Sequence, residues 1–350
     1  MTRKGLFQFR VLPYGLCNAA ATFERLMETV LAGLQWDICL IYIDDVIVHG
    51  RTFEEALGNL KTVFERLRHA GLKLKPDKCK LFSKSVSFLG HIISDKGVAT
   101  DPDKIKAVRE WPIPVNLTEL RSFLGLCSYY RRFISGFSMI AKPLYRLTEK
   151  EQSFLWSDEC DESFRTLKKK LTGAPVLAYP DFSEAFILDT DASDSNIGAV
   201  LSQIQNGTER VICYGSRSLS KAEKKYCVTR TELLALVYFV KYYRHYLLGR
   251  KFTVRTDHNS LRWMLKTKNP EGQLARWIDT LSSFQFEVQH RPGRKHSNAD
   301  ALSRIPCRQC GHKGETIAER VHIGVAVQTD EIQDFNLVDA QSDDSEIVMV

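Results

Sequence analysis

Apolar residues recur along this chain at two spacings, one typical of helices and one typical of strands. After Asn18, and again from about Thr52 to Ala70, they return every three or four positions, which predicts two amphipathic helices. Asn18 is expected to cap the first helix, and Gly71 to close the second. The pattern is helical again from Pro102 to about residue 150, apart from a break at Trp-Pro-Ile-Pro and a restart at Asn116 or Thr118.

Runs rich in β-branched residues predict the strands. In the first third of the chain these are residues 7–16, a hairpin at 38–48 and a strand at 86–91. In the second half they are 186–191, 197–202, 211–216, 252–256 and 284–290. A long helix is expected from near Thr231 to Leu248. The mixture predicts an α/β (α+β), multidomain protein, with a five-stranded mixed sheet in its second half.

Length and charge narrow the class of protein. The 350 residues allow two or three domains, and 44% hydrophobic with 26% charged residues is ordinary for a globular protein. The net charge of +7 is unevenly spread, because the tail from Asp330 has seven acidic residues and no Lys or Arg. The remainder carries 49 basic against 35 acidic residues, or +14. A basic body suits a polyanionic partner.

Cysteine usage and hydropathy predict where the protein works. Nine cysteines, mostly single and in apolar surroundings, are typical of a reduced chain rather than a disulfide framework. The first residues lack the apolar core of a signal peptide, and no apolar run approaches membrane-spanning length. We therefore expect an intracellular protein, in a cytoplasmic particle or the nucleus, not secreted and without a membrane partner.

Two adjacent carboxylates, Asp44 and Asp45, interrupt the apolar run Ile-Cys-Leu-Ile-Tyr-Ile-Asp-Asp-Val-Ile-Val at residues 38–48. Carboxylates held at a strand end can bind Mg²⁺, and two such ions can assist a phosphoryl transfer. The alternative is a surface hairpin, since Asp is a common turn residue.

The order of motifs around this pair resembles the palm of a reverse transcriptase, most closely that of gypsy-type long-terminal-repeat retrotransposons. Leu-Pro-Tyr-Gly-Leu-Cys-Asn-Ala comes first, then Tyr-Ile-Asp-Asp, a Lys-rich segment and Phe-Leu-Gly-His. The resemblance implies that Tyr14 and Gly15 bind the incoming nucleotide and that Asp44 and Asp45 are catalytic metal ligands. The primer grip would consist of Phe88, Leu89, Gly90 and His91.

The sequence departs from that pattern at two points. Ala20 stands where the family usually has Pro, which is a minor change. The family also has fingers and a further metal-binding Asp on an earlier strand, whereas Asp37 is the only Asp before Asp44. We therefore expect an N-terminally truncated polymerase region that does not extend primers by itself.

Four acidic residues in the second half follow the order of the ribonuclease H fold: Asp191, Glu232, Asp257 and Asp300. Taken singly, each has a plain explanation. Thr229 and Glu232 fit a capping box, Asp257 could cap a helix, and Asp300 could lie in a polar turn. Their surroundings resemble the gypsy-type version: Thr-Asp-Ala-Ser, Thr-Glu-Leu-Leu-Ala-Leu, Arg-Thr-Asp-His-Asn-Ser-Leu and Asn-Ala-Asp-Ala-Leu-Ser-Arg.

The resemblance implies a two-metal endonuclease that hydrolyses the RNA of an RNA–DNA hybrid. The four acids would bind two Mg²⁺ ions, with Mn²⁺ as a substitute, as would Asp44 and Asp45 in the polymerase site. His290, ten residues before Asp300, could move a proton near the leaving group or could simply be a solvent-facing His. Candidate hybrid contacts, with the tryptophans also candidates for the core, are Trp263, Trp277, Arg276, Arg291 and Arg294.

The whole pattern predicts five segments: a palm (1–95), a helical thumb (96–150), a connector (151–183), a ribonuclease H domain (184–305) and an acidic tail (306–350). Arg121, Arg131 and Arg132 on the thumb would meet the phosphates of a template–primer duplex. Cys307 and Cys310 are half of a zinc site at most. The parent protein would be a Pol polyprotein with protease and integrase domains, using deoxynucleotides if its palm is complete. The alternative is a polymerase-dead, host-retained or decayed copy that only binds nucleic acid.

Overall fold

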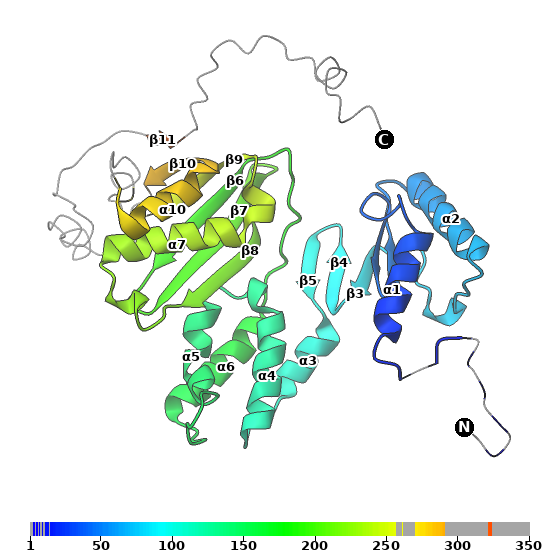
Figure 1. Cartoon of the computed structure of the whole chain (residues 1–350), viewed down its shortest axis with the longest axis horizontal. Coiled ribbons are helices and arrows are strands. Elements are labelled where there is room, and N and C mark those ends of the chain that lie inside the picture. The colour runs from blue at the N-terminus through cyan, green and yellow to red at the C-terminus, as the bar shows by residue number, and fades with distance from the viewer. Residues whose placement is uncertain are drawn as a thin grey trace, which may run out of the picture. The chain divides into compact units, whose positions relative to one another are not determined.

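The computed structural model describes residues 3, 5, 7, 9, 11–13, 15–256, 261 and 270–290, together with the backbone of 321–323. The chain forms two compact units, one of residues 1–112 with 168–179 and the other of 113–167 with 180–350 (Figure 1). No helix within the described ranges is long and apolar enough to cross a bilayer. The architecture is the mixed α/β fold expected from the sequence.

The first unit has a core between two helices and a hairpin. Helix α1 (Ala19–Val30) and helix α2 (Phe53–His69) pack against strands β1 (Cys39–Tyr42) and β2 (Asp45–Val48), which pair antiparallel. Helical spacing places one apolar stripe of each helix toward the hairpin. The buried side chains of this core are Met27, Leu31, Cys39, Ile41, Val63 and Leu67.

The two predicted helix caps differ. Thr52 accepts a hydrogen bond from the backbone N–H of Glu55 at 3.2 Å, and Gly71 closes α2 with φ of 69°. Asn18 precedes α1 but makes no side-chain cap bond, so that prediction is wrong. The reason is its backbone, which is already helical (φ −94°, ψ 0°), whereas a capping side chain needs an extended backbone.

The segment predicted as one strand at 86–91 is a hairpin instead. Strands β3 (Ser85–Phe88) and β4 (His91–Ser94) pair antiparallel across a turn at Leu89 and Gly90. Both turn residues have positive φ, 48° and 68°, as a type I′ turn requires. Positive φ is unusual for Leu, which is why the residue types did not signal this turn.

The first unit is completed by a third strand and two short helical elements. Strand β5 (Gly97–Thr100) pairs with β4, and the 3₁₀ helix η1 (Pro76–Lys78) and helix α3 (Pro102–Glu110) flank this small sheet in sequence. Val98 and Leu177 exchange backbone hydrogen bonds of 2.8 Å. Gly97 permits this approach, because a Cβ there would lie 2.1 Å from the Leu177 carbonyl oxygen.

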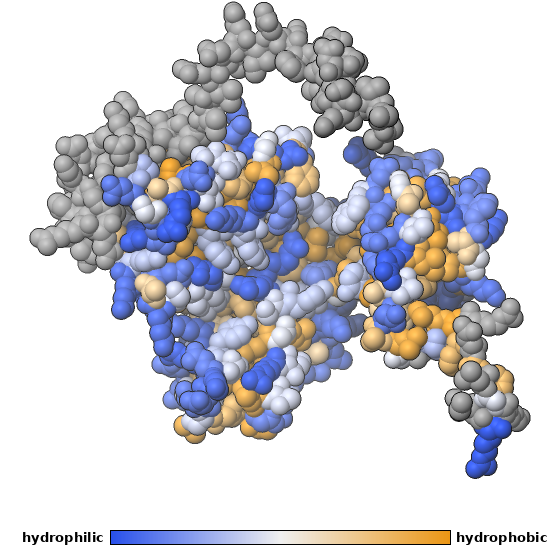
Figure 2. Space-filling view, viewed as in Figure 1, coloured by the Kyte–Doolittle hydropathy of each residue, from blue (hydrophilic) through white to orange (hydrophobic). Residues whose placement is uncertain are grey.

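The first unit also exposes apolar side chains. Figure 2 shows apolar surface over α1 and the segment before it, where Leu12, Leu16 and Leu26 are exposed. Phe53 and Phe82 are exposed too, with ring centroids 4.9 Å apart. Large exposed apolar areas are typical of contact surfaces.

Helices form the first part of the second unit: α4 (Leu117–Tyr129), η2 (Arg131–Phe133), α5 (Phe137–Arg146) and α6 (Asp158–Thr172), whose last turn belongs to the first unit. The Asn116 side chain accepts from the N–H of Glu119 at 2.9 Å, so Asn116 rather than Thr118 caps α4. Phe123 and Phe164 join α4 to α6 with ring centroids 4.6 Å apart.

Arg131, one of the three arginines predicted to meet phosphates, bonds within the second unit. Its guanidinium donates to the Ser216 carbonyl at 2.5 Å and lies 5.4 Å from the Phe137 ring centroid. Arg132 hydrogen-bonds Tyr246. These two side chains therefore help to join the helices to the sheet of this unit, and their contact with phosphates stays a prediction. Arg121 is exposed.

A mixed sheet forms the rest of the second unit. Its strands are β6 (Phe186–Ala192), β7 (Asn196–Gln205), β8 (Thr208–Ser218), β9 (Lys251–Thr256), β10 (Gln285–His290) and β11 (Val321–Ile323). Their order is β11-β10-β9-β6-β7-β8, with β6, β9 and β10 mutually parallel. The five predicted strands are all present, and β11 adds a sixth, antiparallel to β10.

Helix α7 (Val228–Tyr242) lies across this sheet and packs on β6 and β7 (Figure 1). It begins three residues before the predicted Thr231 and ends where the chain leaves helical geometry at Tyr243 (φ −96°, ψ 19°). The remaining helical elements are η3 (Glu223–Lys225), α8 (Arg244–Leu247) and α10 (Gly272–Ser282), the last packed against α7.

Candidate active sites

The first candidate site is the β1–β2 hairpin of the first unit. Tyr42 pairs with Asp45, which leaves Ile43 and Asp44 as a two-residue loop. Both carboxylates are exposed at this end of the hairpin. The structure therefore places Asp44 and Asp45 side by side on a tight turn, where a strand pair fixes their backbones.

The turn between these strands is strained and has an anchor that the sequence did not reveal. Ile43 has φ of 54°, a conformation that is unfavourable for a β-branched residue. Its N–H donates to the Glu24 carboxylate, which comes from α1. This bond fixes the residue directly before Asp44. Glu24 occurs in an ordinary amphipathic helix, so only the folded contact identifies it.

The other predicted polymerase residues are partly described. Gly15 adopts φ of 92°, in keeping with a turn, whereas Tyr14 lies outside the described residues. Phe88 and His91 end the paired strands β3 and β4, and Leu89 is exposed at the turn between them. The Nδ1 atom of His91 lies 2.9 Å from the Leu89 carbonyl oxygen. The predicted primer grip is thus the tip of a β-hairpin.

The second candidate site lies at one end of the second unit's sheet, where several strands finish. Strands β6, β9 and β10 are parallel, so their carboxyl ends meet at the same edge. Asp191 is exposed near the end of β6. Thr256, which precedes Asp257 in the sequence, ends β9 and pairs with exposed His290 at the end of β10. Asp257 and Asp300 themselves lie outside the described residues.

Glu232 approaches this region from the helix above the sheet. It is 4% exposed, in the second turn of α7, which packs on β6. The alternative of a capping box with Thr229 is wrong, because the helix begins at Val228 after Cys227 and Thr229 lies inside it. Glu232 is therefore a nearly buried carboxylate inside a helix that packs on β6.

A cluster of side chains holds the first turns of α7, two residues before Glu232. The Arg230 guanidinium lies 4.5 Å from the Tyr226 ring centroid and 5.9 Å from that of Trp277. It donates to the side-chain oxygen of Gln273, whose amide donates to the Tyr226 hydroxyl at 3.1 Å. Trp277 is half-buried in this cluster, so it belongs to the contact between α10 and α7.

An ion pair fixes the segment that leads into α7. Arg217 donates to both Glu223 carboxylate oxygens, at 2.9 and 3.2 Å, and stacks on Tyr238 at 4.7 Å. Burial alone would raise the pKa of Glu223, but hydrogen bonds from Arg217 and Ser220 lower it below its usual value. The Leu219 N–H also donates to the Ser195 carbonyl at 2.8 Å, which joins this segment to the β6–β7 turn.

The donor chemistry at both sites fits a hard divalent cation, since carboxylate oxygens are the ligands that Mg²⁺ prefers. Across the described ranges, no group of three or more His, Cys, Asp or Glu side chains is arranged to hold a metal ion. Two of the four predicted acids of the second site fall outside those ranges. The described part therefore shows Asp191 and Glu232 on adjoining elements, not a complete ligand set.

Part of each unit matches a known protein family. Residues 1–93 match the family described as reverse transcriptase (RNA-dependent DNA polymerase). Residues 181–284 match the RNase H-like domain found in reverse transcriptase. The two matches follow each other along the chain in the order that its motifs predicted.

Similar proteins include Pol polyproteins of transposons. The chain is 42% identical over 316 residues to the retrovirus-related Pol polyprotein from transposon 297 of Drosophila melanogaster, covering 90% of this chain and 30% of that protein. It is 36% identical over 307 residues to the transposon Tf2-3 polyprotein of Schizosaccharomyces pombe, covering 86% of this chain and 23% of that one. The chain therefore spans less than a third of the length of either relative.

Solved structures of foamy viral protease-reverse transcriptase share the fold. One, a dRH form in complex with double-stranded DNA, has a TM-score of 0.69 and 25% identity, covering 82% of this chain and 51% of that one. Another, in complex with an RNA/DNA hybrid, has a TM-score of 0.66 and 22% identity, covering 88% and 42%. The second likeness concerns the fold alone.

Proposed function

We propose that the second unit is a ribonuclease H that hydrolyses the RNA strand of RNA–DNA hybrids, within a Pol region of the gypsy type. The observation that carries this proposal is the register of three parallel strands. It brings the ends of β6, β9 and β10 to one edge, and with them Asp191, the residue before Asp257, and His290. Separate elements that supply acids to one point are what a two-metal nuclease needs.

In this proposal Asp191, Glu232, Asp257 and Asp300 bind the metal ions, and His290 moves a proton near the leaving group. When bound, two Mg²⁺ ions activate the attacking water and neutralise the charge that develops on the leaving 3′-oxygen. The protein holds its carboxylates on rigid elements: Asp191 on a strand, and Glu232 on a helix fixed by Arg230 and its neighbours. Contacts to the 2′-hydroxyls would select RNA over DNA.

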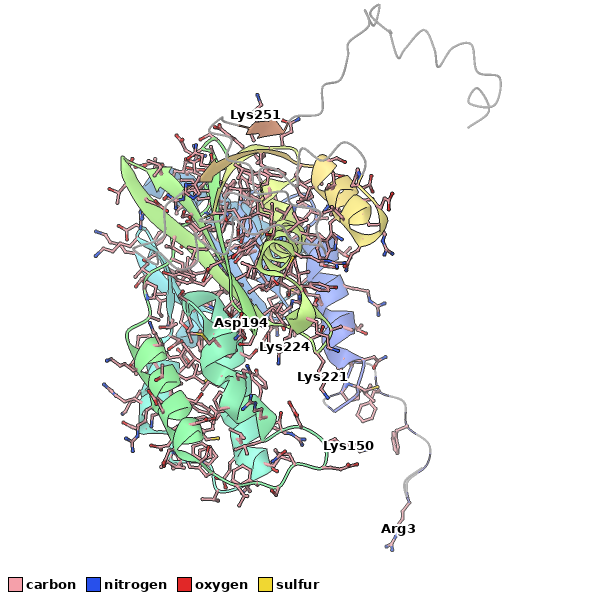
Figure 3. The ribbon with its side chains drawn as sticks, turned by 90° about the vertical axis from the view of Figure 1, so that its left-hand side faces the viewer. Arg3, Lys150, Asp194, Lys221, Lys224 and Lys251 are labelled. Carbon is pink, nitrogen blue, oxygen red and sulfur yellow. The ribbon has the colours of Figure 1, made fainter. Side chains whose placement is uncertain are left out.

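The test is cleavage of an end-labelled RNA–DNA hybrid by the purified chain in Mg²⁺. Asp191→Asn is expected to abolish cleavage, because the amide cannot replace an anionic ligand. Asp194→Asn is the matched control, since Asp194 is an exposed Asp three residues further on (Figure 3). Equal cleavage by parent and Asp191→Asn would refute the proposal. A folded parent that binds the hybrid without cutting it would favour the alternative, a protein that only binds nucleic acid.

For the first unit we propose the matching role in DNA synthesis, in which Asp44 and Asp45 bind Mg²⁺ in an RNA-directed DNA polymerase (nucleotidyltransferase) site. The tight turn and the Glu24 anchor support this role, because they fix the backbone beside both carboxylates. Primer extension by the 350-residue chain tests it. Extension that Asp44→Asn removes would show that this chain's site is sufficient.

A further inference from the structure

Four neighbouring strands of the second unit share one ionic network, centred on Arg255 of β9. The register pairs Arg255 with Asp189 of β6, and the guanidinium donates to both Asp189 oxygens, through Nε at 2.7 Å and through Nη2. It also donates to both oxygens of Glu209 on β8, through Nη1 at 3.0 Å and through Nη2. The Ser202 hydroxyl of β7 donates to Glu209 at 2.8 Å.

The network is placed next to the strand ends that carry the proposed metal ligands. Asp189 lies two residues before Asp191 and, because side chains alternate along a strand, on the same face of β6. Arg255 lies two residues before Asp257 in the sequence. The pair therefore joins β6 to β9 at the last register position that these strands share, two residues before Asp191.

The geometry of this network differs from that of an ordinary surface ion pair. The Arg255 side chain is only 15% exposed and is bound by two carboxylates, each through two hydrogen bonds. Such two-pronged pairs have a defined orientation as well as a favourable energy. By contrast, Arg165 pairs with Asp161 along α6 with its side chain 76% exposed, and pairs of that kind contribute little.

We propose that Arg255 is a positioning residue for metal binding: it holds β6 against β9 in register, so that Asp191 on β6 meets the ions at a fixed position. The physical need arises from repulsion, because carboxylates gathered at one strand edge repel each other until cations bind. The ion pair between Arg255 and Asp189 joins the two strands close to these ends and opposes that separation. This inference rests on the proposed ribonuclease H function.

The test measures metal binding apart from catalysis. Mn²⁺ binding to the nucleic-acid-free protein is measured by isothermal titration calorimetry for the parent, Arg255→Met, Arg255→Lys and the control Arg165→Met. The dissociation constant for Mn²⁺ is expected to rise about tenfold in Arg255→Met, the size seen when partners of metal ligands are lost. The dissociation constant of Arg255→Lys should lie between those of the parent and Arg255→Met, because lysine keeps the positive charge but cannot form the two-pronged hydrogen bonds of a guanidinium. The Mg²⁺ concentration for half-maximal hybrid cleavage should shift by the same factor.

A purely structural role would give another result. Arg255→Met would then unfold at a lower denaturant concentration and still bind Mn²⁺ with the parent's affinity, and this outcome overturns the inference. If Arg255→Met does not fold, the Mn²⁺ affinities of Asp189→Asn and Arg255→Lys are compared with that of the parent. Parental Mn²⁺ affinity in both variants would also overturn the inference. A parent that cuts hybrids while Arg255→Met keeps its metal affinity refutes the inference alone. A parent whose Mn²⁺ binding is unaffected by Asp191→Asn refutes the proposed site and the inference with it.

Discussion

Replacing Gly215 by alanine should destabilise the second unit, because β8 passes directly beneath aromatic side chains there. A Cβ at this position would lie 2.6 Å from the Tyr243 hydroxyl oxygen and 2.8 Å from Cε1 of Phe239. Both side chains are 1% exposed, so neither can turn outward without opening the core. Overpacking of this kind costs about 1–3 kcal/mol, and with two contacts below 3.0 Å we expect ~2 kcal/mol.

Gly125→Ala is the matched control within the same unit. Gly125 lies inside α4, with nothing within 4 Å of an added Cβ. Alanine loses less backbone freedom on folding than glycine, so this variant should be more stable than the parent by about 0.5–1 kcal/mol. The same chemical change is thus expected to have opposite signs at the two positions.

Urea unfolding of the full chain, followed by circular dichroism, measures both variants. A midpoint shift at constant slope gives the change in unfolding free energy. Because Phe239 lies on the helix that carries Glu232, the hybrid-cleavage rate of Gly215→Ala should also fall several-fold. A Gly215→Ala variant within 0.5 kcal/mol of the parent would refute the reasoning, since α7 would then be free to move away from the sheet without loss.

Asn206→Ala, in the β7–β8 turn, should lower the unfolding free energy by about 1 kcal/mol in the same assay, because residue 206 has φ of 52°. Burial raises the pKa of Cys127 to about 12, so iodoacetamide at pH 8 should modify exposed Cys17 but reach Cys127 only after unfolding, as read by peptide mass mapping. Lys142→Glu with Lys224→Glu should reduce the salt slope of hybrid binding by about 2, measured by fluorescence anisotropy, if these neighbouring cations contact phosphates.

Each of these expectations has a contrary outcome. An Asn206→Ala variant as stable as the parent would mean that the turn relaxes to negative φ. Fast labelling of Cys127 in the native protein would show that α4 opens readily. An unchanged salt slope in the Lys142→Glu, Lys224→Glu variant would show that the hybrid does not cross the surface around Lys224 (Figure 3). An equally reduced slope in a Lys168→Glu control would point to a general effect of charge.

The elements of the second unit could be predicted because its strands are long and apolar. Alternating and continuous apolar runs located all five strands. The end of β7 was predicted too early and the start of β8 too late, since β7 continues to Gln205 and β8 begins at Thr208. The residues between them, Asn206 and Gly207, are a recognised type I′ pair and could have signalled the tight hairpin.

The supporting side chains could not be predicted in the same way. Arg255 bonds to residues 66 and 46 positions away in the sequence. Only the strand order of the folded sheet brings these residues together. Arg131 looked like one of three arginines on a helical edge until the fold placed the Ser216 carbonyl beside it. Residue type and spacing therefore indicated the candidate acids, whereas the contacts of the side chains around them arise from tertiary structure.

The strand order β10-β9-β6-β7-β8 also determines how this sheet can assemble during synthesis. Strands β6, β7 and β8 are consecutive hairpins with short separations, so they can pair as soon as they emerge. The edge of β6 that faces away from β7 stays unpaired until β9 has been synthesised, after α7. The outer edge of β9 then stays unpaired until β10, residues 285–290, has been synthesised. An open edge is a template for pairing with other chains. A nascent or cleaved chain that stops between Thr256 and Gln285 would therefore end its sheet on an unprotected β9, which favours pairing with other chains.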